Sequence, residues 1–137
     1  MDYKMNNCQY SLEFQVRDYE CDLQGIVNNA VYQNYLEHTR HQFLLSMGVD
    51  FSGLSKEGVN LVVIRTELDY KSPLKSGDSF TIEVELEQVS PLRFCFNQEI
   101  YKHPDNQLVL TAKVFGTAID EKGKPIRSEN IINIIKK

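Results

Sequence analysis

One helical segment followed by a series of alternating segments constrains the fold of this chain more than any other feature. The helical segment covers residues 31–47, where apolar side chains recur at spacings of four and seven, at Tyr32, Leu36, Phe43 and Met47. This spacing predicts one long helix with a substantially buried face. Asn28 or Asn29 can cap its start, and Gly48 can end it in a left-handed conformation.

Alternating apolar and polar side chains predict strands in the rest of the chain. The segments are 11–19, 64–71, 80–87, 92–100 and 108–119, and the last is apolar on both faces, which burial at a subunit contact would explain. Turn residues such as Gly77 and Pro91 separate them, and short connections favour antiparallel neighbours. We therefore expect an α+β fold in which a curved antiparallel sheet of about five strands buries its apolar face on the helix.

Length, charge and cysteine content narrow the class of protein. A chain of 137 residues fits a single domain, 1–137. The net charge of -4 and the lack of a dense Lys/Arg run argue against nucleic acid as a partner. No segment approaches the ~20 apolar residues of a membrane span, so we expect a cytoplasmic protein that does not bind membranes. The odd number of cysteines, without metal-ligand spacing, predicts reduced thiols, no disulfide and no zinc.

A carboxylate lies a short loop before the predicted helix. Asp22 begins the run Asp-Leu-Gln-Gly-Ile-Val-Asn-Asn-Ala-Val-Tyr, which leads directly into the helical pattern. Unpaired N–H groups at a helix N-terminus can hold a carbonyl oxygen as it gains negative charge. A nearby carboxylate can serve as a nucleophile or as a general base for water. This arrangement can perform acyl-transfer chemistry with no cofactor and no metal.

The same run resembles the 4-hydroxybenzoyl-CoA thioesterase family. The resemblance rests on Val16-Arg17, on the run from Asp22 to Tyr32, on a helix carrying Glu37 and Arg40, and on the segment Tyr-Lys-Ser-Pro-Leu-Lys-Ser-Gly-Asp at 70–78. It implies the hotdog fold, in which the sheet wraps the long helix. It also implies that subunits pair and that acyl-CoA thioesters are hydrolysed at the dimer interface.

The resemblance also implies roles for individual residues. Asp22 matches the catalytic Asp, and the backbone N–H of Asn29 would polarise the thioester oxygen. Contacts with substrate are expected at Gly25, Val27, Asn28, Tyr32 and Arg93. Many relatives carry a His in this loop, whereas the nearest histidines here are His38 and His41 on the predicted helix. Acid–base duty would therefore fall on Asp22 alone.

Each of these residues also has a purely structural interpretation. An Asp before a helix can cap it or interact with its positive end. Tyr32 lies on the apolar stripe and can be core, and Glu37 can pair with Arg40 at helical spacing or face solvent. Cys21 fits a quiet thiol, because no cationic partner lies near it in sequence. Further candidates for CoA phosphate contacts, which could equally be solvated side chains, are Lys71, Lys75 and Lys102.

The sequence therefore predicts an acyl-CoA thioesterase that hydrolyses its substrate to a free acid and CoA as a homodimer or homotetramer. One alternative is a thioesterase acting on acyl carrier protein. Another is a hotdog module that binds acyl-CoA without hydrolysing it. The tail at 127–137 carries four isoleucines among polar residues and fits a short helix, or a strand packed on a neighbour.

Overall fold

The computed structural model describes residues 8–136 of the chain. The first seven residues and the last one of the predicted single domain lie outside this range. The elements in chain order are β1 (Tyr10–Gln15), the 3-10 helix η1 (Asp18–Glu20), α1 (Asn29–Ser46), α2 (Phe51–Lys56), β2 (Asn60–Tyr70), β3 (Ser79–Ser90), β4 (Arg93–Lys102), β5 (Gln107–Ile119), β6 (Pro125–Ile126) and α3 (Glu129–Lys136).

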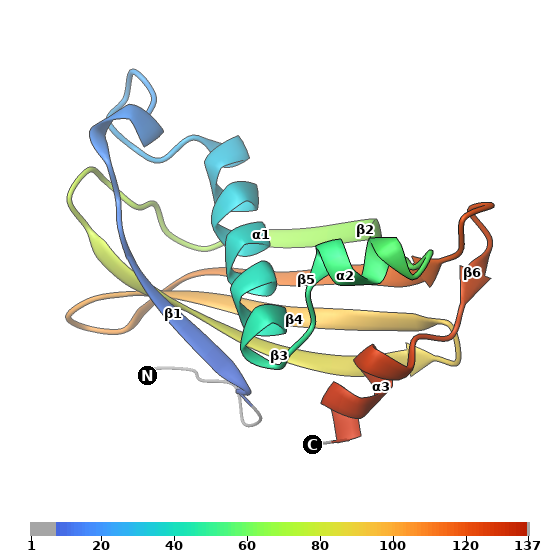
Figure 1. Ribbon diagram of the computed structural model, residues 1–137. Helices are drawn as coiled ribbons and strands as arrows, with labels where there is room; N and C mark the ends of the chain where they lie inside the picture. Colours follow the sequence, from blue (N-terminus) through green and yellow to red (C-terminus); the bar gives the residue numbers. More distant parts are fainter. Residues whose placement is uncertain (1–7, 137) are drawn as a thin grey trace.

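All six strands form one antiparallel sheet. The main order is β1-β3-β4-β5-β2, and the two-residue β6 pairs with β5 outside this path. Short hairpins connect β3 with β4 and β4 with β5, which makes each an immediate neighbour of the next. The sheet is curved, and α1 lies across one of its faces while β1 and β2 form its two edges (Figure 1). The architecture is consistent with the hotdog thioesterase fold.

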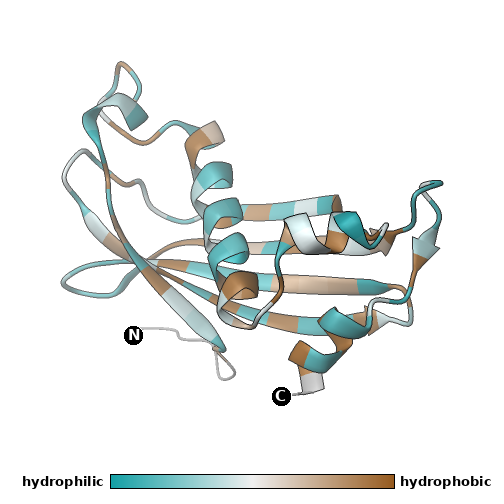
Figure 2. Ribbon diagram, viewed as in Figure 1, coloured by the Kyte–Doolittle hydropathy of each residue, from teal (hydrophilic) through white to brown (hydrophobic). Residues whose placement is uncertain are grey.

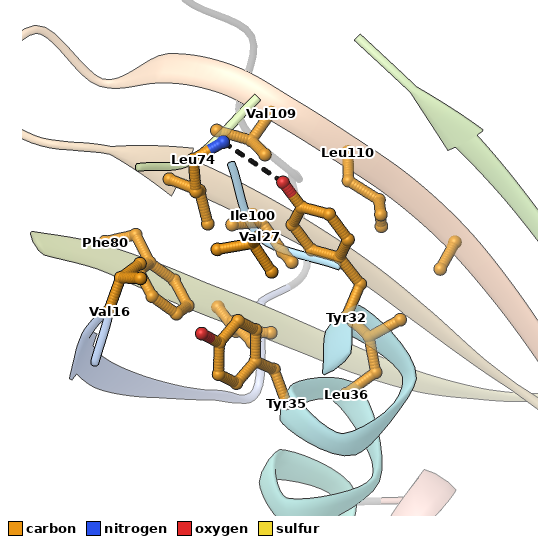
Figure 3. Packing of buried hydrophobic residues seen from close by; sticks show 12 residues of the cluster. Val16, Val27, Tyr32, Tyr35, Leu36, Leu74, Phe80, Ile100, Val109 and Leu110 are labelled. Atoms are coloured by element: carbon orange, nitrogen blue, oxygen red, sulfur yellow. Dashed lines mark hydrogen bonds between the residues drawn. The ribbon is translucent and has the colours of Figure 1, made fainter. Parts of the chain in front are cut away.

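The core lies between α1 and the sheet, as the alternation predicts. Ile82 and Val84 of β3 are fully buried on the face towards α1, and Figure 2 shows apolar residues interspersed with polar ones along the strands. A first cluster of buried side chains surrounds Tyr32, Tyr35 and Leu36 in the N-terminal half of α1 (Figure 3). A second surrounds Phe43 in its C-terminal half. Apolar burial on this scale is the main stabilising contribution to such a domain.

The ends of α1 follow the predicted signals. Asn28 is the N-cap, and its side-chain oxygen accepts a hydrogen bond of 2.9 Å from the N–H of Ala30. Gly48 follows the helix with φ of +84°, the left-handed conformation that ends helices at little cost for glycine. The tail forms the helix α3, as one of the two interpretations expected, with Ile131, Ile132 and Ile134 buried.

The structure differs from the expectations in several elements. The sheet has six strands rather than about five, because β6 adds a pair that is too short to show any alternation. The predicted first strand at 11–19 ends at Gln15 and is followed by η1, where the side chain of Glu20 accepts the N–H of Arg17 at 2.8 Å. The six-residue α2 was not predicted, because it is shorter than two helical turns.

Candidate active site

Asp22 lies in a tight turn between β1 and α1. Its N–H donates to the carbonyl of Ile26 at 2.8 Å, and its carbonyl accepts the N–H of Gly25 at 3.0 Å. One carboxylate oxygen, Oδ1, accepts the N–H groups of Gln24 at 2.8 Å and of Ile26 at 3.5 Å. The other oxygen, Oδ2, has no hydrogen bond within residues 8–136. The turn therefore fixes the carboxylate through one oxygen and leaves the second available at an exposed site.

The start of α1 leaves one backbone donor unused. The N–H of Asn28 donates to the carbonyl of Glu20 at 3.0 Å, and that of Ala30 is capped by the Asn28 side chain. The N–H of Asn29, between them, makes no hydrogen bond to any described residue. A free N–H at the positive end of an 18-residue helix can bind an oxygen that gains negative charge.

The loop that carries Asp22 is anchored to the segment between β2 and β3. Cys21 pairs with Val27 and Ile26 with Lys75 as isolated bridges, and the N–H of Val27 donates to the carbonyl of Leu74 at 2.8 Å. The hydroxyl of Tyr32 accepts the N–H of Leu74 at 3.1 Å, the contact drawn as a dashed line in Figure 3. Tyr32 and Val27 are both buried in the first cluster.

A second contact, which the sequence did not indicate, ties the loop to α1. The hydroxyl of Tyr35 donates a hydrogen bond of 2.8 Å to Oε1 of Glu20, the oxygen that also accepts the Arg17 N–H. Burial, followed by this contact with the carboxylate, raises the pKa of Tyr35. Tyr35 therefore stays protonated and donates. A Tyr on the buried stripe of a helix was the only available signal for this residue.

Among the residues expected to contact substrate, Arg93 stands apart. It is the first residue of β4 and lies at the β3–β4 hairpin, whereas the Asp22 loop lies at the opposite end of the sheet (Figure 1). Lys102, at the far end of β4, is nine residues away, or about 30 Å along a strand. One chain therefore does not bring Arg93 and Asp22 together. Lys75, through its pairing with Ile26, is adjacent to the Asp22 loop.

The buried stripe of α1 contains two polar residues that the periodicity leaves out. Thr39 and Arg40 are buried where an apolar stripe would continue. The Thr39 hydroxyl donates to the carbonyl of Tyr35 at 2.8 Å, and Nη1 of Arg40 donates to Oε1 of Gln98 at 3.1 Å. Glu37 is exposed, and no described residue forms an ion pair with it. The sequence signal for these residues was the seven-residue interval between Leu36 and Phe43 in the series of apolar positions.

Three further observations concern the described residues. No His lies in the Asp22 loop, since His38 and His41 are on α1. Within residues 8–136, no group of three or more His, Cys, Asp or Glu side chains is placed to hold a metal ion. None of the helices in this range is both long enough and apolar enough to cross a membrane.

Comparison with known families defines the class of protein. The profile of the thioesterase-like superfamily matches residues 16–131, which is most of the chain. The chain belongs to this superfamily. The crystal structure of Slr0204, a 1,4-dihydroxy-2-naphthoyl-CoA thioesterase from Synechocystis, has the same fold, with a TM-score of 0.88 at 21% identity over 93% of this chain and 96% of that one.

Relatives of the chain are named as thioesterases of two kinds, one for acyl carrier protein esters and one for acyl-CoA esters. Acyl-acyl carrier protein thioesterase ATL3 of Arabidopsis thaliana is 38% identical over 118 residues, which make up 86% of this chain and 62% of ATL3. The matched residues make up 63% of ATL2 of the same plant. The chain therefore spans less than two thirds of the length of either relative. Long-chain acyl-CoA thioesterase FadM of Escherichia coli is 29% identical over 110 residues, 80% of this chain and 83% of FadM.

These comparisons confirm the predicted resemblance at the level of the superfamily. The narrower 4-hydroxybenzoyl-CoA family is not confirmed, because the structural neighbours include thioesterases for 1,4-dihydroxy-2-naphthoyl-CoA and gentisyl-CoA. The narrower assignment stays a prediction.

Proposed function

We propose that this protein is a thioesterase that hydrolyses an acyl-CoA to a free acid and CoA, with Asp22 as the reactive carboxylate. The observation that carries the proposal is that one loop holds both a carboxylate oxygen without a hydrogen-bond partner among residues 8–136, Oδ2 of Asp22, and an unused N–H at the start of α1. Thioesterase-family relatives and structural neighbours support thioester hydrolase activity.

The N–H of Asn29 would hold the thioester oxygen as it becomes negative. Asp22 would then act by one of two routes. As a general base it takes a proton from water, whose oxygen bonds to the carbonyl carbon while the C–S bond breaks and the thiolate leaves. As a nucleophile it bonds to the same carbon, expels the thiolate and forms an anhydride that water then hydrolyses. A thiolate is a good leaving group, so neither route demands a separate strong acid.

The rest of the loop would position the substrate. Gly25 would allow the turn to approach the thioester, and Asn28 would keep the helix start in place as its cap. Val27 and Tyr32 would support the acyl group from beneath, through the buried face of the loop. Because Arg93 lies at the other end of its own chain's sheet, its proposed CoA contact requires the Asp22 of a second subunit.

The edge strand β2 supports assembly into a homodimer or homotetramer. It has eleven residues and no proline, and among residues 8–136 its one neighbour is β5, so its other edge presents backbone groups that no described residue pairs with. Val63, Ile64 and Tyr70 on this strand are 53%, 45% and 49% exposed. A long edge strand with exposed apolar side chains tends to pair with another chain, and pairing with a second copy would cover these side chains.

The carrier of the acyl group separates this proposal from its main alternative. FadM supports CoA, and the Arabidopsis relatives support acyl carrier protein. We favour CoA, since Lys71 and Lys75 flank the segment that anchors the Asp22 loop and can pair with CoA phosphates. A non-catalytic acyl-CoA-binding module is the third possibility.

The test is release of free thiol from matched acyl-CoA and acyl-carrier-protein esters of several chain lengths and of aryl acids. We expect faster release from CoA esters. Faster release from carrier-protein esters would favour the alternative enzyme. Tight binding of acyl-CoA by calorimetry without release from either carrier would identify a binding module and overturn the proposal.

A further inference from the structure

A cavity of about 340 Å³ lies between the second half of α1, α2 and the sheet. Its volume falls in the range of small-molecule sites. Its walls are mainly apolar, with Leu44, Phe51, Phe94, Phe96 and Val114 among the lining residues. Three polar residues of α1, Glu37, Arg40 and His41, also line it. No role was predicted for this cavity, because its walls come from segments far apart in the chain.

Arg40 is the unusual member of this wall. It is only 7% exposed, and its guanidinium carbon lies 5.9 Å from the centre of the Phe96 ring. Its Nη1 donates to Gln98, whose Nε2 in turn donates to the carbonyl of Leu36 at 3.0 Å. This is the one hydrogen bond of the Arg40 side chain among residues 8–136, although a guanidinium has five N–H donors. No carboxylate of a described residue lies within ion-pair distance of Arg40.

The cost of this arrangement suggests a ligand. A buried charge without a counter-ion destabilises a fold unless polar partners compensate it. Burial lowers the pKa of Arg40, yet a guanidinium stays protonated in proteins. Glu37, one turn earlier, acts on Arg40 electrostatically without contacting it. A hydroxyl group placed between the two can do both, because its oxygen accepts a hydrogen bond from Arg40 and its O–H donates one to Glu37.

The position of the cavity sets the distance of that hydroxyl from the reacting carbon. Arg40 follows Asn29 by eleven residues, or about 16 Å along a helix. Within one subunit, an acyl group whose carbonyl oxygen is held by the Asn29 N–H would need a hydrocarbon chain of roughly this length to reach Arg40. A single aromatic ring is too short to bridge them.

We propose that this cavity binds the far end of an acyl chain and that Arg40 and Glu37 select chains carrying a hydroxyl group there. The inference rests on the proposed thioesterase function and names its substrate class. Arg40 is a specificity residue in this account, and it takes no part in the chemistry at the thioester.

The test compares dodecanoyl-CoA with 12-hydroxydodecanoyl-CoA. Affinities are measured by calorimetry in the Asp22→Asn background, and kcat/KM is measured in the protein with Asp22 intact. We expect the hydroxylated chain to be preferred at least tenfold in both. Arg40→Met should abolish the preference, mainly through the affinity, whereas the control Arg127→Met, at an exposed residue outside the cavity, should retain it.

A second variant covers the case in which Arg40→Met fails to fold because Gln98 loses its partner. Arg40→Met/Gln98→Leu removes both polar groups and should fold with at least the stability of the wild-type protein. Equal affinities for the two acyl-CoAs when Arg40 is intact would overturn the inference. A preference for the hydroxylated acyl-CoA that survives in the double variant would also overturn it. Turnover of both chains without discrimination would overturn it while sparing the thioesterase proposal. Failure to release CoA from either would count against that proposal, and the affinities would still decide this one.

Discussion

Asp22 and Asp120 make the same turn in two parts of the chain. In each turn the aspartate N–H donates to the carbonyl four residues later, at 2.8 Å for Asp22 and 2.9 Å for Asp120. In each, Oδ1 accepts the N–H groups two and four residues later, and a glycine three residues later has positive φ. The turn around Asp22 leads to the N-terminus of α1, whereas that around Asp120 leads to β6. Asp120 thus provides an internal reference for what this turn does structurally.

Gly25→Ala should weaken both the fold and the reaction, whereas Gly123→Ala should weaken only the fold. The two glycines have φ of +79° and +82°, and an added Cβ would meet nothing within 4 Å at either. The cost is therefore conformational, about 1 kcal/mol at each position. We expect equal losses of stability in chemical denaturation and a several-fold lower kcat for Gly25→Ala alone. An equal loss of activity in the two variants would show that the Asp22 turn is not special.

Tyr35→Phe should lower the free energy of unfolding by about 1–2 kcal/mol, because a hydrogen bond to a carboxylate is lost. The Glu20 carboxylate keeps its bond to the Arg17 N–H, so the loop is loosened rather than released. Urea unfolding measures the loss. Tyr10→Phe is the control, because the Tyr10 ring packs on Phe43 and none of the described hydrogen bonds uses its hydroxyl. Equal stability of Tyr35→Phe and the wild-type protein would mean that the Tyr35–Glu20 contact contributes nothing.

Stability should fall in alkaline solution through Cys95. Burial raises the pKa of this thiol to about 11, from an ordinary value of 9.0. Below pH 9 both folded and unfolded states hold the proton, whereas between pH 9 and pH 11 only the folded state does. The stabilisation is therefore present at neutral pH and lost as the pH rises through this window. The stability of Cys95→Ala should fall less steeply with pH than that of the wild-type protein. The stability of Cys8→Ala, at an exposed thiol, should fall as steeply as that of the wild-type protein.

Ile64→Lys should prevent assembly if β2 is the subunit contact. The side chain is 45% exposed on the edge strand, and a lysine there would place a charge in the new interface. Light scattering should report a monomer for Ile64→Lys and a dimer or tetramer for Val89→Lys, a control at a 51% exposed apolar residue of β3. An unchanged mass for Ile64→Lys would place the contact elsewhere.

Local signals in the sequence predicted most of the sheet and the helix that it covers. Alternation identified β3 and β4 because apolar side chains recur at every second residue on the face towards α1, as at Ile82 and Phe96. The N-cap and the glycine after α1 were predictable because each acts through its own backbone neighbours. These features depend on residues close together in the chain.

Features set by distant residues could not be predicted in the same way. Arg40 is buried because Gln98, 58 residues later, receives its hydrogen bond. The β2 alternation breaks at a register shift between Val63 and Arg65, opposite β5. Part of the candidate site could be predicted, because Asp22 and the start of α1 are close together in one sequence motif. The separation of Arg93 from Asp22 could not, because it depends on the path of β4 through the sheet.

The rate of thiol release by Asp22→Asn, measured beside Asp120→Asn on the best acyl-CoA substrate, tests the central claim most directly. Asparagine keeps an oxygen that can accept the turn hydrogen bonds, so both variants should lose the same small amount of stability. If Asp22 is the reactive carboxylate, Asp22→Asn should lower kcat by at least about a hundredfold while Asp120→Asn keeps the wild-type rate. Two variants with equal stability and equal, near wild-type rates would contradict the account and leave Asp22 with the purely structural role of its counterpart.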